Sequence, residues 1–212
     1  DIMAQGGEGV LVSGARTRFN DTTSVFGEER LRYGGGYGGL THAYGLDFVP
    51  IEHWRAGLGV EWGDLHDPLA GDVARVATTV SIGYAFAGLT YSGKFEYRND
   101  KTDSVVAGHS DRDTYLARNT VGMKVSEDWR FIGRLNGSYS TGSLGTFYDG
   151  SFVEAVTGFA YRPVANDRLN MLFKYTYFYD LPSPGQLTLA GGTADYSQQS
   201  HVVSVDAAYD VT

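Results

Sequence analysis

Hydrophobic and polar residues alternate with a period of two along most of the chain. In one such segment, Trp54, Leu58 and Trp62 lie on one side, while Arg55 and Glu61 lie on the other. Alternation over about ten residues is typical of a half-buried β-strand, and no segment has the spacing of an amphipathic helix. The predicted strands are residues 9–19, 30–48, 53–63, 74–86, 87–99, 113–125, 129–140, 151–162, 168–180 and 200–211.

The connections between these segments alternate between long and short. All of the prolines fall in connections, because proline cannot donate a hydrogen bond to a β-ladder. Since every second connection is short, the pattern predicts antiparallel neighbours in an up-and-down order, with two unlike ends. The long connections are residues 20–29, 64–73, 100–112, 141–150 and 181–199, and the short ones are 49–52, 86–87, 126–128 and 163–167.

A glycine-rich stretch interrupts the second segment. Leu31 and Tyr33 occupy odd positions, whereas Leu40 and Tyr44 occupy even ones. The apolar side therefore changes phase across residues 34–39. A one-residue β-bulge would restore the register there, and glycine is the residue that permits it. We expect this bulge, and the alternative is two shorter strands joined by a glycine turn.

The composition narrows the class of protein. The chain has 212 residues, a formal net charge of −8, a pI near 5.0 and no cysteine. The lack of cysteine excludes disulfides and thiolate metal sites, and the acidic balance argues against a nucleic-acid-binding surface. The length fits one domain, so we expect residues 1–212 to form a single β-barrel domain. No apolar run is long enough for a transmembrane helix.

The distribution of aromatic and charged residues indicates which side of the strands faces lipid. Antiparallel strands without a covering helix must close or stack, and a membrane barrel turns its apolar side outward. Aromatic residues gather near both ends of the strands on the apolar side, as expected at two membrane interfaces. The predicted aromatic girdles are Trp54, Trp62, Tyr84, Tyr97, Trp129, Tyr139, Tyr161 and Tyr177. The predicted lumen-lining charges are Arg55, Glu61, Arg75, Lys94, Glu96, Arg98, Arg118, Arg130, Arg134, Glu154 and Lys174.

With these aromatic belts, an aliphatic middle band and alternating connection lengths, the chain resembles a Gram-negative outer-membrane β-barrel over almost all of residues 9–211. The resemblance implies an outer-membrane location, periplasmic short turns, extracellular long loops and a first strand that runs outward. Such barrels commonly end on an aromatic residue, whereas this chain ends Tyr209-Asp210-Val211-Thr212. We therefore expect either another assembly signal or further strands, so that about ten strands is a minimum.

The sequence favours a non-enzymatic role. We expect an all-β, antiparallel, up-and-down transmembrane barrel that serves as a passive porin-like channel or a membrane anchor, alone or as one part of a larger surface protein or complex. The lipid bilayer is the expected partner. No catalytic residue, metal, cofactor or nucleic acid is expected. In a narrow barrel the inward charges would form an ion-pair plug, and in a wider one they would line a water-filled pore.

Two other classes of function stay open. A membrane-embedded hydrolase would use Asp and His residues of the extracellular loops to activate water. A soluble ligand-binding β-barrel would turn its apolar side inward. The candidate hydrolase residues are Asp64, His66 and Asp67 in one predicted loop and His109, Asp111 and Asp113 in the next.

Overall fold

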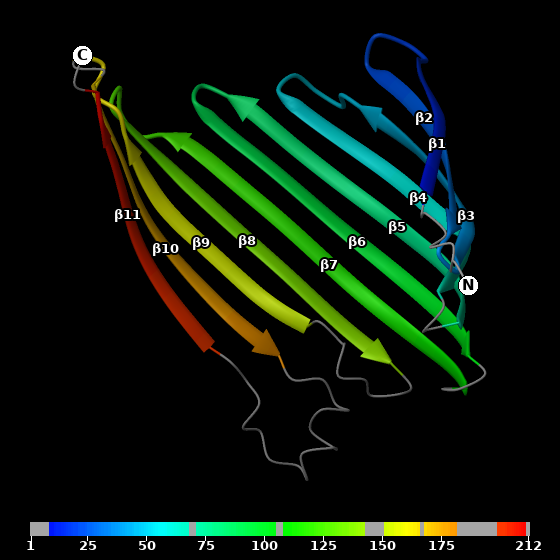
Figure 1. Ribbon diagram of the computed structural model, residues 1–212. Coiled ribbons are helices and arrows are strands. Elements are labelled where there is room, and N and C mark those ends of the chain that lie inside the picture. The colour runs from blue at the N-terminus through cyan, green and yellow to red at the C-terminus, as the bar shows by residue number, and fades with distance from the viewer. Residues whose placement is uncertain are drawn as a thin grey trace.

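The structure is a computed structural model that describes residues 9–67, 71–104, 108–142, 151–165, 168–181 and 199–210. These residues form one sheet of 11 strands in sequence order, each antiparallel to its neighbours (Figure 1). The all-β, up-and-down prediction is therefore confirmed. The strands are β1 (Gly9–Arg18), β2 (Thr23–Gly34), β3 (Tyr37–Phe48), β4 (Trp54–Asp67), β5 (Gly71–Phe86), β6 (Leu89–Ser104), β7 (Gly108–Lys124), β8 (Trp129–Gly142), β9 (Ser151–Tyr161), β10 (Leu169–Leu181) and β11 (Gln199–Tyr209).

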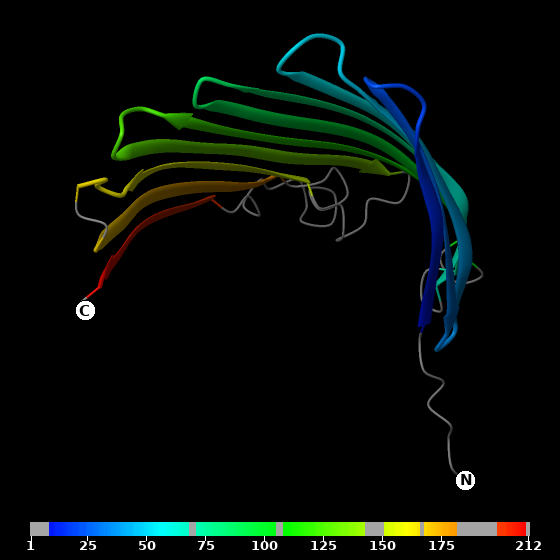
Figure 2. The ribbon, with the colours of Figure 1, turned by 90° about the horizontal axis from the view of Figure 1, so that it is seen from above.

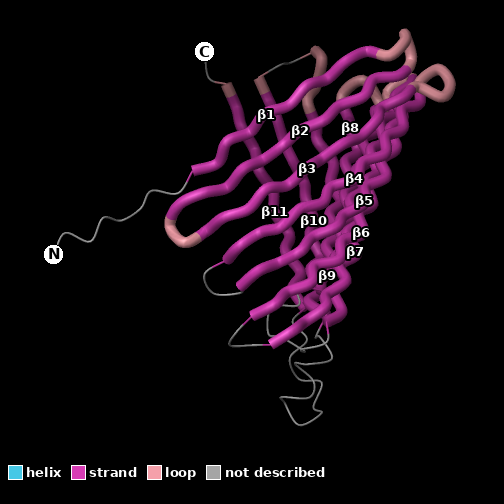
Figure 3. Tube along the Cα trace, turned by 90° about the vertical axis from the view of Figure 1, so that its right-hand side faces the viewer, coloured by secondary structure: helices cyan, strands magenta, loops and turns pink. Residues whose placement is uncertain are grey.

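The sheet curves into an arch, with β1 to β3 turned sharply against the rest (Figures 2 and 3). β1 and β11 are its two edges, and within the described residues they do not pair with each other. Strand twist and strand tilt produce this curvature, which is the geometry of a barrel wall. The concave side of the arch is therefore a candidate lumen.

The expected β-bulge at the glycine-rich stretch is wrong, and the alternative of two strands with a glycine turn is correct. β2 and β3 meet at a tight turn in which Gly34, Gly35 and Gly36 all have positive φ, at 91°, 62° and 86°. Glycine adopts these angles without the steric cost that a side chain would add. The chain can therefore reverse direction at this turn. Since β2 begins at Thr23, no long loop occupies residues 20–29.

Because β2 and β3 are two strands where the sequence predicted one, β1 runs in the opposite direction to the one expected. We call the end that holds residues 49–53, 87–88 and 125–128 the turn end, and the opposite end the distal end. β1 finishes at the turn end, where the Thr22 amide donates to the Asn20 side chain (2.9 Å). The predicted first strand was expected to finish at the other end, so its predicted direction is wrong.

The distal ends of β4 to β7 also differ from the prediction. Residues 64–73 and 100–112 were expected to be loops. Instead, β4 continues to Asp67 and β5 begins at Gly71. In the same way, β6 continues to Ser104 and β7 begins at Gly108. Polar residues on both sides of these strands removed the alternation that marks a strand in sequence.

Glycine permits the sharp curve between β3 and β4. Gly63 lies opposite Thr41, and a Cβ atom on Gly63 would overlap the Leu40 carbonyl oxygen and approach the Thr41 Cα to 2.7 Å. Nearby Gly59 is different, because its Cβ would lie 3.7 Å from the nearest atom, the Tyr44 carbonyl oxygen. The backbones of β3 and β4 therefore approach more closely at Gly63 than at Gly59, and the approach at Gly63 leaves no room for a side chain.

We expect Gly63→Ala to lower the free energy of unfolding by about 1–3 kcal/mol, because overpacking forces the backbone to shift. Gly59→Ala, on the same strand and the same face, is the matched control and should cost much less. Urea unfolding in lipid vesicles measures both. Equal losses for the two variants would show that the close approach at Gly63 does not shape the sheet.

Candidate functional site: the polar face of the sheet

The strand register places all of the predicted lumen-lining charges on one face, which we call the polar face. Directly opposed residues share a face of a sheet. Arg55 lies opposite Gly83, and Lys94 lies opposite both Ser81 and Arg118. Following the register from strand to strand places the following on this face: Arg55, Glu61, Arg75, Lys94, Glu96, Arg98, Arg118, Arg130, Arg134, Glu154 and Lys174.

Most carboxylates on the polar face are paired with a basic side chain. Arg75 donates two hydrogen bonds to the two carboxylate oxygens of Asp100, at 2.7 and 3.3 Å. This pair is the least exposed of the ion pairs, and a bidentate arginine contact is among the strongest. Further ion pairs are Arg16–Asp47 (2.7 Å), Arg98–Glu96 (2.6 Å), Lys94–Glu96 (3.1 Å) and Arg134–Glu154 (2.8 Å).

Basic residues outnumber acidic ones on this face, although the whole chain carries a net charge of −8. Among the strand side chains that the structure describes, the polar-face cations are Arg16, Arg18, Arg30, Arg32, Arg55, Arg75, Lys94, Arg98, Arg112, Arg118, Lys124, Arg130, Arg134 and Lys174. The polar-face carboxylates are Glu28, Asp47, Glu61, Glu96, Asp100, Glu154, Asp180 and Asp206. The acidic excess of the chain therefore lies elsewhere, and the polar face is cationic.

Several of these cations have no carboxylate partner in the described part of the chain. Arg55, Arg118, Arg130 and Lys174 are exposed and make no ion pair with a described residue. Arg118 also lies directly opposite Lys94, and Arg130 lies directly opposite Lys124. Like charges in directly opposed positions destabilise a sheet, unless water or a counter-anion screens them. The polar face is therefore suited to contact with water and anions.

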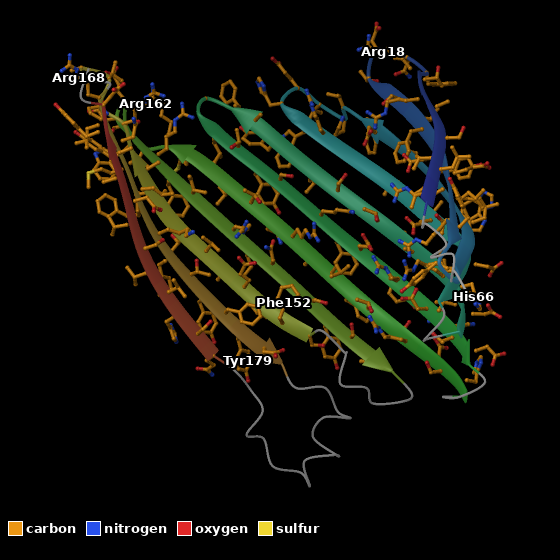
Figure 4. The ribbon with its side chains drawn as sticks, viewed as in Figure 1. Arg18, His66, Phe152, Arg162, Arg168 and Tyr179 are labelled. Carbon is orange, nitrogen blue, oxygen red and sulfur yellow. The ribbon has the colours of Figure 1, made fainter. Side chains whose placement is uncertain are left out.

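Two adjoining clefts follow the concave side of the bend. The larger, about 520 Å³, lies towards the turn end and is lined by Arg16, Arg18 and Arg55. The other, about 410 Å³, is lined by Arg16, Asp47, Gly59 and Lys94, among others. Arg18 marks the turn end of this region in Figure 4. Small residues on β4 and β5 form the floor, so that basic side chains rise around an open path.

The opposite face is apolar in the middle and aromatic at both ends. Every residue of the predicted girdles lies on this face. Trp54 packs on Tyr84 across β4 and β5 with ring centroids 4.9 Å apart, and Trp129 packs on Tyr161 at 4.7 Å. Val80, between the two rows, is 46% exposed. We call this the apolar face.

The separation of the aromatic rows fits the thickness of a bilayer. On the distal side Tyr97 packs on Tyr115 at 5.2 Å, and Trp62 stacks on Tyr44 at 5.4 Å. Trp54 and Trp62 are about 26 Å apart along β4, at about 3.3 Å per residue. For a strand tilted by about 40°, this distance spans about 20 Å along the membrane normal, which is most of the apolar band of about 25 Å in outer-membrane barrels.

The hydrolase candidates lie on strands and not in loops. His66, Asp72, Asp103 and His109 form one row across β4 to β7, on the apolar-face side and beyond the distal aromatic row. The Nδ1 atom of His66, the residue labelled in Figure 4, lies 2.6 Å from an Asp72 carboxylate oxygen. Asp72 and Asp103 belong to this row although neither is among the residues predicted from the sequence.

Three of the remaining hydrolase candidates lie on the same face as this row. Asp64, Asp111 and Asp113 lie on the same face as His66, and Asp111 and Asp113 accept hydrogen bonds from Asn99 at 2.7 and 3.0 Å. The side chain of Asp67 is outside the described residues. No group of three or more metal-ligating side chains occurs within the described ranges.

Comparison with known proteins identifies the class of fold. No protein-family model and no curated protein matches the chain. Among solved structures, it is similar to the outer membrane channel DcaP of Acinetobacter baumannii, with a TM-score of 0.69 and 13% identity over 93% of this chain. The chain spans 61% of the DcaP chain.

Two further solved structures are less similar. One is the NanC porin, with a TM-score of 0.42 and 11% identity over 96% of this chain and 98% of that one. The other comes from work on in-meso crystallization of membrane proteins, with a TM-score of 0.41 and 11% identity over 96% of this chain and 78% of that one.

The chain therefore shares its fold with a solved outer-membrane channel, and its antiparallel up-and-down order is the one that the sequence pattern predicted. In the portion of the chain that the structure describes, no helix is long and apolar enough to cross a membrane.

Two neighbouring residues on β5 test the assignment of the faces. Val80 lies on the apolar face and Thr79 on the polar face, both between the aromatic rows. We expect Val80→Arg to cost about 2–4 kcal/mol on folding into bilayers, because a cation near the bilayer midplane is desolvated. Thr79→Arg should cost much less, since its side chain reaches the cationic, hydrated face.

Trp62→Arg is the control for depth, because Trp62 belongs to an aromatic row. The charge itself should cost about 0–1 kcal/mol there. Urea titrations in vesicles measure all three variants. If Trp62→Arg were as damaging as Val80→Arg, a soluble barrel with an apolar core would explain the fold better than a membrane barrel.

Proposed function

We propose that the protein is a passive diffusion channel of the bacterial outer membrane, in which the polar face lines a water-filled lumen that favours anions. The observation that carries this proposal is the set of exposed polar-face cations that make no ion pair within the described ranges, represented by Arg55, Arg118 and Arg130. The DcaP structure, described as an outer membrane channel, supports the channel class.

The same cations favour an open channel over a plugged anchor. In a lumen filled by protein, an unpaired charge would be strongly destabilising, because little water reaches it. Lys94 opposite Arg118 and Lys124 opposite Arg130 would add repulsion to that cost. Water and mobile anions remove both penalties. The ion pairs, such as Arg75–Asp100, would then stiffen the wall, and the unpaired cations would act on the solutes.

Selectivity follows from the summed charge of the wall. Fixed cations beside a low-dielectric wall raise the local concentration of anions and repel cations. Transport of this kind needs no covalent step, nucleophile or cofactor. We therefore assign solute positioning to Arg55, Arg118, Arg130 and Lys174, and wall stability to the paired residues.

We expect the wild-type protein in planar bilayers to pass chloride in preference to potassium. Arg55→Glu, Arg118→Glu and Arg130→Glu combined should bring the permeability ratio below one, because the change replaces three cations with three anions on the lumen wall. Reversal potentials in a potassium chloride gradient measure the ratio. Lys101→Glu, a single charge reversal on the other face of the sheet, is the control for each single Arg→Glu variant of the set. If the triple variant conducts and its chloride-to-potassium permeability ratio equals that of the wild type, the assignment of the polar face to the lumen is contradicted.

The two ends of the sheet should differ in their exposure on whole cells. We place the turn end in the periplasm and the distal end outside the cell, by the resemblance to outer-membrane barrels. A tag inserted at Gly108, at the distal end of β7, should react with a membrane-impermeant label. A tag at Val164, between β9 and β10, should not. Equal labelling of both tags would refute this orientation.

A further inference from the structure

The inner wall formed by β8, β9 and β10 differs from the rest of the polar face. Its polar-face side chains include Arg130, Ile132, Ala160, Leu172 and Lys174. Elsewhere this face carries mainly charged, hydroxyl or glycine residues. Here apolar and basic residues alternate, and Ile132 is 41% exposed although it lies between two arginines on β8. We call this region the mixed wall.

The register arranges the mixed wall as four corners around a flat floor. In one row Arg130 on β8 lies opposite Ala160 on β9, which lies opposite Leu172 on β10. In the next row Ile132 lies opposite Gly158, which lies opposite Lys174. Each row therefore has one cation and one apolar side chain at its ends.

The floor of the mixed wall leaves space for a small molecule. Ala160 and Gly158 are small, and the corners on β8 and β10 are two strand spacings apart, about 10 Å. A cleft of about 1150 Å³ lies over the row of Arg130, Ala160 and Leu172 and is also lined by Ile132. Glu127, Asp128 and Asp206 line its margins, and Lys174 lies in the next row, outside the lining. This volume is ample for a ligand of one ring.

The charges at the mixed wall determine which chemistry fits. Arg130 and Lys174 make no ion pair with a described residue, so both can donate to a ligand. Asp206 lies opposite Leu172 on β11, on the side away from Ala160. A negative group is therefore favoured beside Arg130 or Lys174, and disfavoured both towards β11 and towards Glu127 and Asp128 at the turn end. Ile132 and Leu172 would contact the apolar part of the same molecule.

A pair of aromatic rings extends the apolar surface towards the distal end. Phe152 on β9 stacks on Phe178 on β10, with ring centroids 5.7 Å apart and planes 24° apart (Figure 4). Both residues belong to the polar face. A path along β9 and β10 therefore offers apolar contacts beyond the mixed wall, which the glycine- and serine-lined bend between β3 and β5 does not.

We infer that the mixed wall is a binding site for monocarboxylates with an apolar body, such as an aromatic ring. This inference rests on the proposed channel function and specifies its solutes. Inorganic anions and hydroxylated organic acids would use the charges of the wall but gain nothing from Ile132 and Leu172. The wall would therefore sort anions by their apolar surface.

Titration calorimetry with benzoate and with gluconate tests this inference on the protein in detergent micelles, with protein-free micelles as the blank. Both probes carry one carboxylate, and only benzoate has an apolar ring. We expect benzoate to bind about tenfold more tightly than gluconate, the scale of discrimination that an apolar contact provides. Equal affinity for the two probes would overturn the inference.

Two pairs of variants separate apolar contact from general disruption. Ile132→Ser with Leu172→Ser should abolish the preference for benzoate and leave the affinity for gluconate unchanged. Ile132→Val with Leu172→Met should keep the preference, because the apolar surface is retained. Wild-type-like benzoate binding by the serine pair, or loss of the preference in the conservative pair, would contradict the site.

Conductance distinguishes failure of this inference from failure of the proposed function. If chloride passes in preference to potassium while benzoate and gluconate bind alike, the proposed channel function is supported and the binding site at the mixed wall is refuted. If the protein binds benzoate selectively but does not conduct, the binding site is supported and the proposed channel function is refuted.

Arg130→Gln with Lys174→Gln should weaken binding of both probes, since both carry a carboxylate.

Discussion

Backbone pairing is the constraint on which the rest of this structure depends. Within a bilayer, every backbone N–H and C=O group needs a partner in the protein, and strands supply one only from a neighbouring strand. The antiparallel ladder from β1 to β11 meets this need for each strand between the two edges. Because side chains on a strand alternate, the same ladder separates the residues into an apolar face and a polar face.

The two faces of the sheet carry different kinds of side chain and therefore suit different solvents. The apolar face carries exposed aliphatic residues such as Val80 between rows of aromatic pairs, and lipid is the solvent that suits this arrangement. The polar face carries ion pairs such as Arg75–Asp100 beside cations such as Arg118 that have no described carboxylate partner. Paired charges hold a wall together, whereas unpaired cations need water and anions, which is the basis of the proposed channel.

The sequence predicted the parts of the fold where alternation is strict and failed where it is broken. β4 and β5 were evident because Leu58 and Val80 belong to long alternating runs. Residues 23–29 of β2 were misread as part of a loop because Glu28 and Glu29 are adjacent, and the register places Glu29 on the apolar face opposite His42.

The same failure removed residues from the candidate site. Asp100, the partner of Arg75, fell in a predicted loop, so the two-hydrogen-bond contact between Arg75 and Asp100 could not be foreseen. The mixed wall depends on which residues of β8 and β10 lie opposite the same residues of β9, and only the strand register supplies that.

The most direct test of the account is single-cysteine labelling along residues 76–84 of β5, since the chain has no cysteine of its own. With the protein in vesicles, a water-soluble thiol reagent should modify positions 77, 79, 81 and 83 and spare 76, 78, 80 and 82. Uniform labelling, or the opposite alternation, would contradict a water-filled polar face and a lipid-facing apolar face.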